Sequence, residues 1–178
     1  MTFPTTRLLL PVLLALGSLP LHAGKVRVEI PPGTDFSRYK TYSWLPPKVL
    51  TNTGVVENHP VIGPAMKDAI NRQLAQRGLT EVPEGGDLQV SALALTASIP
   101  QLEAVVFGGP AMMYGTPIAT MGRYNKEGTL VINLIDPRTK KSVFLGLAQQ
   151  SLDNKEGSGV QKLPSAAAKI FKKYPAPK

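Results

Sequence analysis

Polar and apolar residues alternate strictly over residues 25–30, where Val26, Val28 and Ile30 occupy every second position. Because successive side chains of a strand point to opposite faces, this pattern predicts a strand with one buried face. Residues 39–45 are rich in aromatic and β-branched residues and predict a second strand. Residues 46–58 have the Pro, Asn, Thr and Gly content that is typical of a surface loop.

Two segments repeat apolar residues at intervals of three and four, which is the spacing of an amphipathic helix. The first covers residues 60–77, and Gly78 supplies a left-handed stop after it. The second ends before Pro175 and has Pro164 in its first turn, where proline is tolerated. The apolar positions are Ile62, Met66, Ala69, Ile70 and Leu74 in the first helix, and Leu163, Ala166, Ala167, Ile170, Phe171 and Tyr174 in the second.

Three further strands are predicted between these helices. Residues 87–99 alternate at first and then become mostly apolar, as expected of a central strand. Residues 128–135 and 142–152 form a hairpin around a turn that begins at Asp136 and Pro137. The order of elements predicts an α+β fold, with an antiparallel or mixed sheet of about five strands and two helices packed on one face.

A long loop rich in Gly and Met is predicted at residues 100–127. Long loops are uncommon in compact domains and often carry binding sites. This loop is also apolar, and methionine suits adaptable contact surfaces. We expect it to contact a partner protein or a lipid-like ligand, although it can instead fold back as an edge strand or cover one face of the sheet. The candidate contact residues are Phe107, Met112, Met113, Tyr114, Ile118 and Met121.

The first 23 residues have the pattern of a cleavable signal peptide. Arg7 gives a positive start, residues 8–16 are apolar, and residues 17–23 contain small or helix-breaking residues that end at Ala23. The apolar stretch is shorter than the ~20 residues that cross a bilayer, so no transmembrane anchor is expected after cleavage. Residues 24–178 then form a single domain in the periplasm of a Gram-negative bacterium.

Cysteine is absent from the sequence. Its absence excludes thiol nucleophiles, disulfides and lipoprotein acylation. Cleavage after Ala23 removes one arginine and no acidic residue, which lowers the formal net charge from +8 to +7. This basic character favours anionic partners such as lipopolysaccharide, anionic lipid headgroups or peptidoglycan carboxylates, or it serves only solubility. Nucleic acid is not expected, because few aromatic residues are present to stack on bases.

No catalytic, cofactor-binding or metal-binding residue is predicted. His59 is the one histidine after the signal peptide, and its place before the first helix favours a capping or exposed role over a ligand role. Asp35, Asp136 and Asp153 lie near turns, where an aspartate more often bonds its own backbone than it acts as a catalytic acid. Residues 157–159 (Gly-Ser-Gly) lack the pattern of a nucleophile elbow and are typical of a linker.

Three segments resemble the bacterial envelope family known as domain of unknown function 4136. They are residues 35–44 (DFSRYKTYSW), residues 128–136 (GTLVINLID) and, more weakly, residues 166–175 (AAAKIFKKYP). The resemblance implies a periplasmic or membrane-anchored α+β domain with no established reaction. Many members of the family look like lipoproteins, but the absence of cysteine here means that a lipid anchor does not carry over.

These observations predict a non-enzymatic binding or assembly module of the cell envelope. We expect it to bind an envelope protein or an anionic envelope component, or to form a homo-oligomer. The alternative is a periplasmic carrier that shelters an apolar or lipid-like ligand between the sheet and the 100–127 loop. An unrecognised hydrolase is the third possibility, disfavoured by the small number of reactive side chains.

Overall fold

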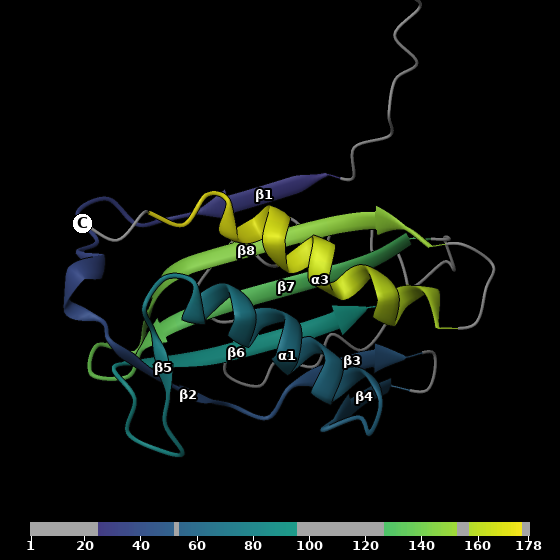
Figure 1. Ribbon diagram of the computed structural model, residues 1–178, viewed down its shortest axis with the longest axis horizontal. Coiled ribbons are helices and arrows are strands. Elements are labelled where there is room, and N and C mark those ends of the chain that lie inside the picture. Colours follow the sequence, from purple (N-terminus) through teal and green to yellow (C-terminus); the bar gives the residue numbers. More distant parts are fainter. Residues whose placement is uncertain (1–24, 52–53, 96–126, 153–156, 176–178) are drawn as a thin grey trace, which may run out of the picture.

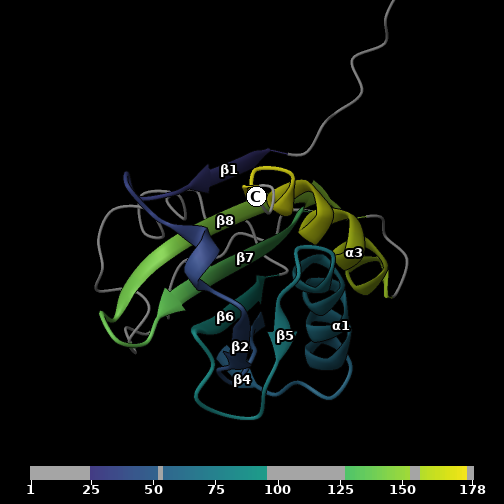
Figure 2. The same ribbon diagram turned by 60° about the vertical axis from the view of Figure 1, so that its left-hand side comes forward.

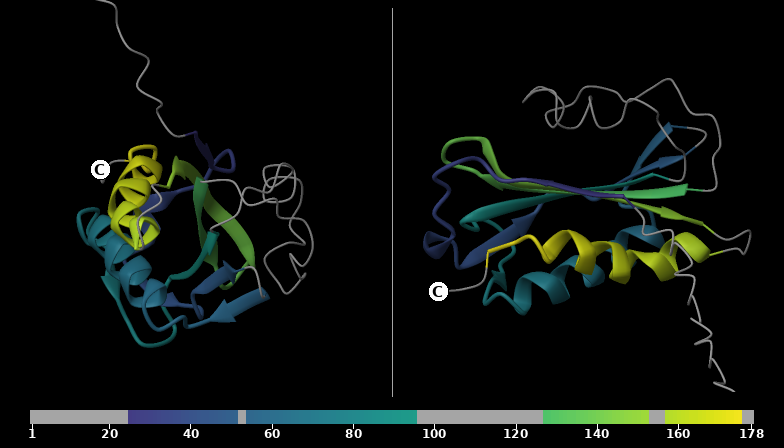
Figure 3. Two further views of the ribbon diagram at one scale, coloured as in Figure 1. Left: turned by 90° about the vertical axis from the view of Figure 1, so that its right-hand side faces the viewer. Right: turned by 90° about the horizontal axis from the view of Figure 1, so that it is seen from above.

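The computed structural model describes residues 25–51, 54–95, 127–152 and 157–175. In this part of the chain, an eight-stranded sheet carries two α-helices on one face (Figures 1 and 3). The sheet is mixed, because its strands pair in both parallel and antiparallel fashion. The predicted α+β class, the mixed sheet and the two helices on one face are therefore confirmed, although the sheet has more strands than the five expected.

The elements follow one another along the chain without a repeat. The strands are β1 (Val26–Glu29), β2 (Thr41–Trp44), β3 (Lys48–Thr51), β4 (Gly54–Glu57), β5 (Thr80–Glu81), β6 (Leu88–Leu95), β7 (Glu127–Asp136) and β8 (Lys141–Ser151). The helices are the short 3₁₀ helix η1 (Phe36–Arg38) and the α-helices α1 (Ile62–Ala75) and α3 (Ser158–Phe171).

The antiparallel strands β1, β8, β7 and β6 lie side by side in that order and form one half of the sheet. On its other side, β6 pairs in parallel with both β2 and β3, at different points along its length. Beyond these two strands, β5 pairs with β2, and β4 pairs with β3. Figure 2 shows β1 at one edge of the sheet and β4 at the opposite side.

The prediction of a loop over residues 46–58 was wrong, because β3 and β4 form a hairpin there. Val49 is fully buried and pairs with Val56 on one side and with Ala94 of β6 on the other. The prolines before β3 end β2 but do not prevent a new strand from starting. A strand this short gains its stability from long-range pairing with β6, which local composition does not reveal.

The main core lies between the helices and the sheet. Met66, Ile70 and Leu74 of α1 are fully buried, which confirms the apolar stripe predicted for this helix. In α3, Ile170 packs directly over Gly146 of β8, where a side-chain methyl group would overlap the Ile170 Cγ2 atom. Glycine at this position therefore lets α3 approach the sheet.

The second helix starts earlier than the sequence indicated. Residues 158 and 159, expected to be linker, form the first turn of α3, and Gly157 precedes them with a φ angle of 77°. Pro164 consequently lies inside the helix and not in its first turn, on the exposed side. Because proline has no backbone N–H group, the helix loses one hydrogen bond at this position. The carbonyl group left without that bond can be solvated by water on the exposed side, which limits the loss of stability.

Several predictions fall on other parts of the chain. The signal peptide, residues 96–99 of the predicted central strand and residues 100–126 of the predicted loop lie outside the described residues. At the boundary, β7 begins at residue 127, so the loop predicted over 100–127 ends one residue earlier than expected. The helices of the described part include none that is long and apolar enough to cross a membrane.

Candidate functional site

The six residues proposed to contact a partner all lie between residues 96 and 126, outside the described part of the chain. Their role therefore stays a prediction. Among the described residues, hydrogen-bonded carboxylates lie at one end of the sheet and an apolar cavity lies at the other. We call the end with the β7–β8 turn the turn end, and the end where β6 stops and β7 begins the cavity end.

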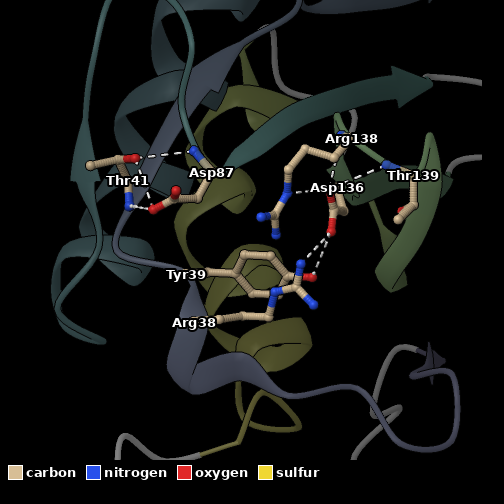
Figure 4. Close-up of polar contacts among 7 residues, drawn as sticks. All are labelled: Arg38, Tyr39, Thr41, Asp87, Asp136, Arg138 and Thr139. Carbon is tan, nitrogen blue, oxygen red and sulfur yellow. Dashed lines mark hydrogen bonds and ion pairs between the residues drawn. The ribbon is translucent and has the colours of Figure 1, made fainter.

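At the turn end, the buried carboxylate of Asp136 joins three parts of the chain (Figure 4). Its Oδ1 atom accepts hydrogen bonds from the backbone N–H groups of Arg138 (2.9 Å) and Thr139 (3.4 Å), which closes the turn. Its Oδ2 atom accepts from the Tyr39 hydroxyl and from the Arg38 guanidinium, both at 3.3 Å. Burial, followed by the negative charge of Asp136, raises the pKa of Tyr39 above its ordinary value. This aspartate therefore ties η1 and its following segment to the turn.

A second carboxylate at the same end joins β2 to the start of β6 (Figure 4). The Oδ2 atom of Asp87 accepts from the backbone N–H groups of Lys40 (2.9 Å) and Thr41 (3.0 Å) and from the Thr41 hydroxyl (3.0 Å). The Thr41 hydroxyl oxygen in turn accepts from the Asp87 backbone N–H at 3.0 Å. The two backbone hydrogen bonds lower the pKa of the Asp87 carboxyl group.

Close to this clamp, Gly86 allows the two backbones to approach each other. A methyl group on Gly86 would lie 2.5 Å from the Ser43 nitrogen and from the Tyr42 carbonyl carbon. These are backbone atoms that cannot move aside without disturbing the β2–β6 pairing. The glycine is thus part of the structural connection that Asp87 fixes.

An aromatic cluster fills the same end between η1 and the C-terminal turn of α3. Phe36 and Tyr174 have ring centroids 4.7 Å apart, and Arg77 lies over the Phe171 ring at 5.1 Å. The Arg77 guanidinium donates to the carbonyl oxygens of Gln73 and Phe171, and burial lowers its pKa. Burial also raises the pKa of Tyr174 to about 12. A pocket of about 280 Å³ lies beside this cluster and is lined in part by Arg77, whose guanidinium is already bonded to two carbonyl oxygens of the protein.

Two other predicted polar residues also make local contacts. His59 Nδ1 accepts from the backbone N–H groups of Val61 and Ile62, both at 3.3 Å. His59 therefore caps the start of α1, which is one of the two roles that the sequence favoured. Asp35 Oδ1 accepts from the Ser37 backbone N–H and hydroxyl groups in the η1 turn. The third turn aspartate considered, at position 153, lies outside the described residues.

At the cavity end, a hollow of about 270 Å³ lies between the N-terminal ends of α1 and α3 and the adjoining ends of β6, β7 and β8. Glycines and apolar side chains make up most of its wall. The wall includes Ile62, Ala94, Gly128, Leu130, Leu152, Gly159, Leu163 and Ala166. This arrangement suits an apolar ligand.

Two polar groups at the cavity end are buried without a hydrogen-bond partner among the described residues: the Thr129 hydroxyl and the Gln150 side-chain nitrogen. Both residues line the cavity. The Gln150 Oε1 atom, at the other end of the same amide, accepts a hydrogen bond from the Ser165 hydroxyl at 3.1 Å. Buried polar groups are nearly always hydrogen-bonded in proteins, so these two single out the cavity end as the candidate site.

The sequence did not predict this cavity. Its walls come from five elements, and nothing local in the chain shows that Ala94, Gly128 and Ala166 face one another. The one available signal was the Gly-Ser-Gly segment at 157–159, which was interpreted as a linker. Within the described ranges there is also no group of three or more His, Asp or Glu side chains placed to hold a metal ion.

The fold and the cavity define a mixed-sheet α+β domain with two helices on one face and an apolar site at one end. The sequence matches the model of the family described as domain of unknown function (DUF4136) over residues 26–176. The chain therefore belongs to this family, which confirms the resemblance seen in residues 35–44 and 128–136. No curated protein matches the sequence significantly.

Three solved structures share the fold at low sequence identity. A DUF4136 family protein from Bacteroides thetaiotaomicron has 10% identity and a TM-score of 0.57, covering 84% of this chain and 95% of that one. A PelC dodecamer from Paraburkholderia phytofirmans has 14% identity and a TM-score of 0.53, covering 87% and 99%. A PDZ domain protein from Parabacteroides distasonis has 16% identity and a TM-score of 0.51, covering 84% and 35%.

Proposed function

We propose that this protein is a non-catalytic assembly module of the bacterial cell envelope that works as an oligomer of identical copies. The observation that carries this proposal is the likeness to PelC, a protein crystallised as a dodecamer, over 99% of the PelC chain. Because the likeness covers 99% of that chain, a fold of this kind is compatible with assembly of identical copies.

Identical subunits that join head-to-tail need two different surfaces that fit each other. The described sheet offers two different edges, one formed by β1 and the other formed by β4 together with β5. A strand at a sheet edge presents backbone groups that are free to pair with another chain. The two edges are thus suited to a head-to-tail contact between copies.

The β4 side carries apolar surface that favours such a contact. Val55 of β4 and Val61 before α1 are the large hydrophobic side chains that remain exposed in the described part, at 45% and 62% of their surface. Between them, Glu57 forms an exposed ion pair with Lys48 at 3.1 Å. Exposed apolar side chains and a charged pair on one surface are compatible with a protein interface, in which apolar contacts are surrounded by polar ones.

The polar chemistry of the described residues supports a non-catalytic role. The carboxylates of Asp136 and Asp87 hold backbone N–H groups in place, and His59 Nδ1 accepts from the start of α1. Each of these groups has a structural task that accounts for its position. The signal-like residues 1–23 and the absence of cysteine support release into the periplasm as a protein without a lipid anchor.

Light scattering after size-exclusion chromatography tests the assembly. The purified protein is expected to elute as an oligomer, and the double variant Val55→Glu and Val61→Asp is expected to elute as a monomer. Aspartate is favourable at the start of α1, so the second change leaves the helix intact. Gln76→Glu, on an exposed position at the far end of α1, is the matched control and should stay oligomeric.

A wild-type protein that stays monomeric at all concentrations would overturn the assembly proposal. An oligomer that survives the double change would instead place the interface away from β4. Fractionation of the producing cells, with N-terminal sequencing of the periplasmic protein, tests the location. Intact residues 1–23 on a cytosolic protein would contradict it.

A carrier of an apolar or lipid-like ligand is the second candidate function. One observation favours it, the apolar cavity of about 270 Å³ at the cavity end.

A further inference from the structure

We propose that the cavity between the N-terminal ends of α1 and α3 binds a single anionic acyl chain, with its hydrocarbon tail inside and its carboxylate at the rim. This inference deepens the carrier function and does not depend on self-association. It rests on the size of the cavity, on its lining and on the polar groups that border it.

The size of the cavity suits one chain. Its volume of about 270 Å³ exceeds the roughly 150 Å³ that suffices for benzene in an apolar cavity. It lies just below the range of about 300–1,000 Å³ that is typical of pockets for drug-sized molecules. A ligand with two chains or several fused rings is too large, whereas one hydrocarbon chain of medium length fits.

The lining is shaped by small residues at positions where packed domains usually carry larger ones. Ala94 and Gly128 come from the sheet, and Gly159 and Ala166 come from α3. Gly128 makes room for the Leu152 side chain, because a methyl group on it would lie 2.9 Å from the Leu152 Cδ2 atom. Protein interiors are otherwise close-packed, so the small residues Ala94, Gly159 and Ala166 around one space preserve a void. Ile62, Leu130 and Leu163 complete an apolar wall. A hydrocarbon tail that leaves water and packs against this wall is stabilised by the hydrophobic effect.

The polar groups at the border fit a carboxylate head. Lys162 is the one charged residue among the described residues that line the cavity. Its Nζ atom donates to the Ser151 carbonyl oxygen, which holds the positive charge at the end of β8, and that charge attracts an anion. The Gln150 side-chain amide also lines the cavity. Its Oε1 atom accepts from the Ser165 hydroxyl, and its Nε2 atom is buried without a hydrogen-bond partner in the described part. A carboxylate oxygen gives that amide the acceptor it lacks. Gly157, which also lines the cavity, is exposed, so the cavity reaches the surface at that residue.

Isothermal titration of the full-length purified protein with decanoate, below its micellar concentration, tests the proposal. We expect saturable binding with one site per chain. Gly159→Leu places a side chain in the cavity and should weaken decanoate binding at least tenfold. The backbone leaves room for a Cβ atom, because a methyl group at Gly159 would lie 3.9 Å from the Leu152 Cδ2 atom, an ordinary contact.

Gln161→Leu is the matched control, since it adds the same side chain to an exposed position of α3 that does not line the cavity. It should bind decanoate as the wild type does. Ala166→Leu is a second cavity-filling change, and urea unfolding of each variant shows that it is folded. Equal affinity of Gly159→Leu and Gln161→Leu, or no binding by the wild type, overturns the proposal.

Titration with decanol separates the contribution of the carboxylate to binding from that of the hydrocarbon tail. Decanol should bind several-fold more weakly than decanoate, and Lys162→Gln should remove most of that difference. Equal binding of both ligands by the wild type contradicts the carboxylate part of the proposal. Binding to phosphatidylglycerol vesicles without binding to decanoate would indicate docking on a lipid surface and would also overturn it. The oligomeric state of each variant, measured in parallel, separates failure of this proposal from failure of the assembly proposal.

Discussion

The two ends of the sheet differ in how far their buried polar groups are hydrogen-bonded. At the turn end, the buried Asp136 carboxylate accepts hydrogen bonds from two side chains and two backbone N–H groups. At the cavity end, the Thr129 hydroxyl is buried without a partner in the described part of the chain. Side chains that look reactive in the sequence thus build the framework, and the candidate site lies among alanines and glycines.

The largest expected effect comes from breaking the turn end. Asp136→Ala removes the acceptor of the Tyr39 hydroxyl and of two backbone N–H groups, and leaves the first of these buried and unpaired. We expect a loss of about 3 kcal/mol in the free energy of unfolding, measured by urea denaturation. Asp35→Ala, at an exposed turn, should cost about 1 kcal/mol. Equal losses of unfolding free energy in the two variants would show that the buried Asp136 network stabilises the fold no more than the exposed turn does.

The comparison is sharpened by making one chemical change at both ends. Thr129→Val replaces an unpaired buried hydroxyl with a methyl group of similar size and should raise the free energy of unfolding by about 1 kcal/mol. Thr41→Val removes a hydroxyl that bonds Asp87 and should lower it by about the same amount. Urea denaturation of the ligand-free protein measures both. Destabilisation by Thr129→Val would mean that its hydroxyl is bonded, for example to an ordered water.

The smallest expected effect is a change in acid sensitivity. The folded state lowers the pKa of Asp87 below its ordinary value, so the ionised form stabilises the fold. This contribution is complete above the unfolded pKa and is lost as the pH falls through the folded value. Between pH 5 and pH 3 the wild type should therefore lose more stability than Asp87→Asn. Glu84→Gln, which removes an exposed carboxylate nearby, is the control and should follow the wild type.

Much of the fold could be predicted from periodicity. The alternation around Val26 and Val28 and the stripe from Met66 to Leu74 match β1 and α1, because burial of one face imposes those periods on the sequence. The β7–β8 hairpin was equally clear, since Asp136 starts its turn. In these elements the local pattern and the final packing agree.

The misses have physical reasons. β3 and β4 are four residues each and depend on pairing between Val49 and the distant Ala94, which composition does not encode. The start of α3 was hidden because Gly159 and Pro164 are poor helix formers, and only packing against the sheet holds them in a helix. The cavity was missed for a related reason, because its walls meet only in the tertiary structure.

The pairing of β1 with β8 brings the first described strand beside the last one, with Val26 opposite Ala148. That contact closes a loop of more than a hundred residues, and a chain must lose considerable freedom before such a pairing stabilises it. We therefore expect β1 to dock late in folding, after the β7–β8 hairpin has formed locally. The edge strand β1 therefore stays unpaired until β8, more than a hundred residues later in the chain, is in place beside β7.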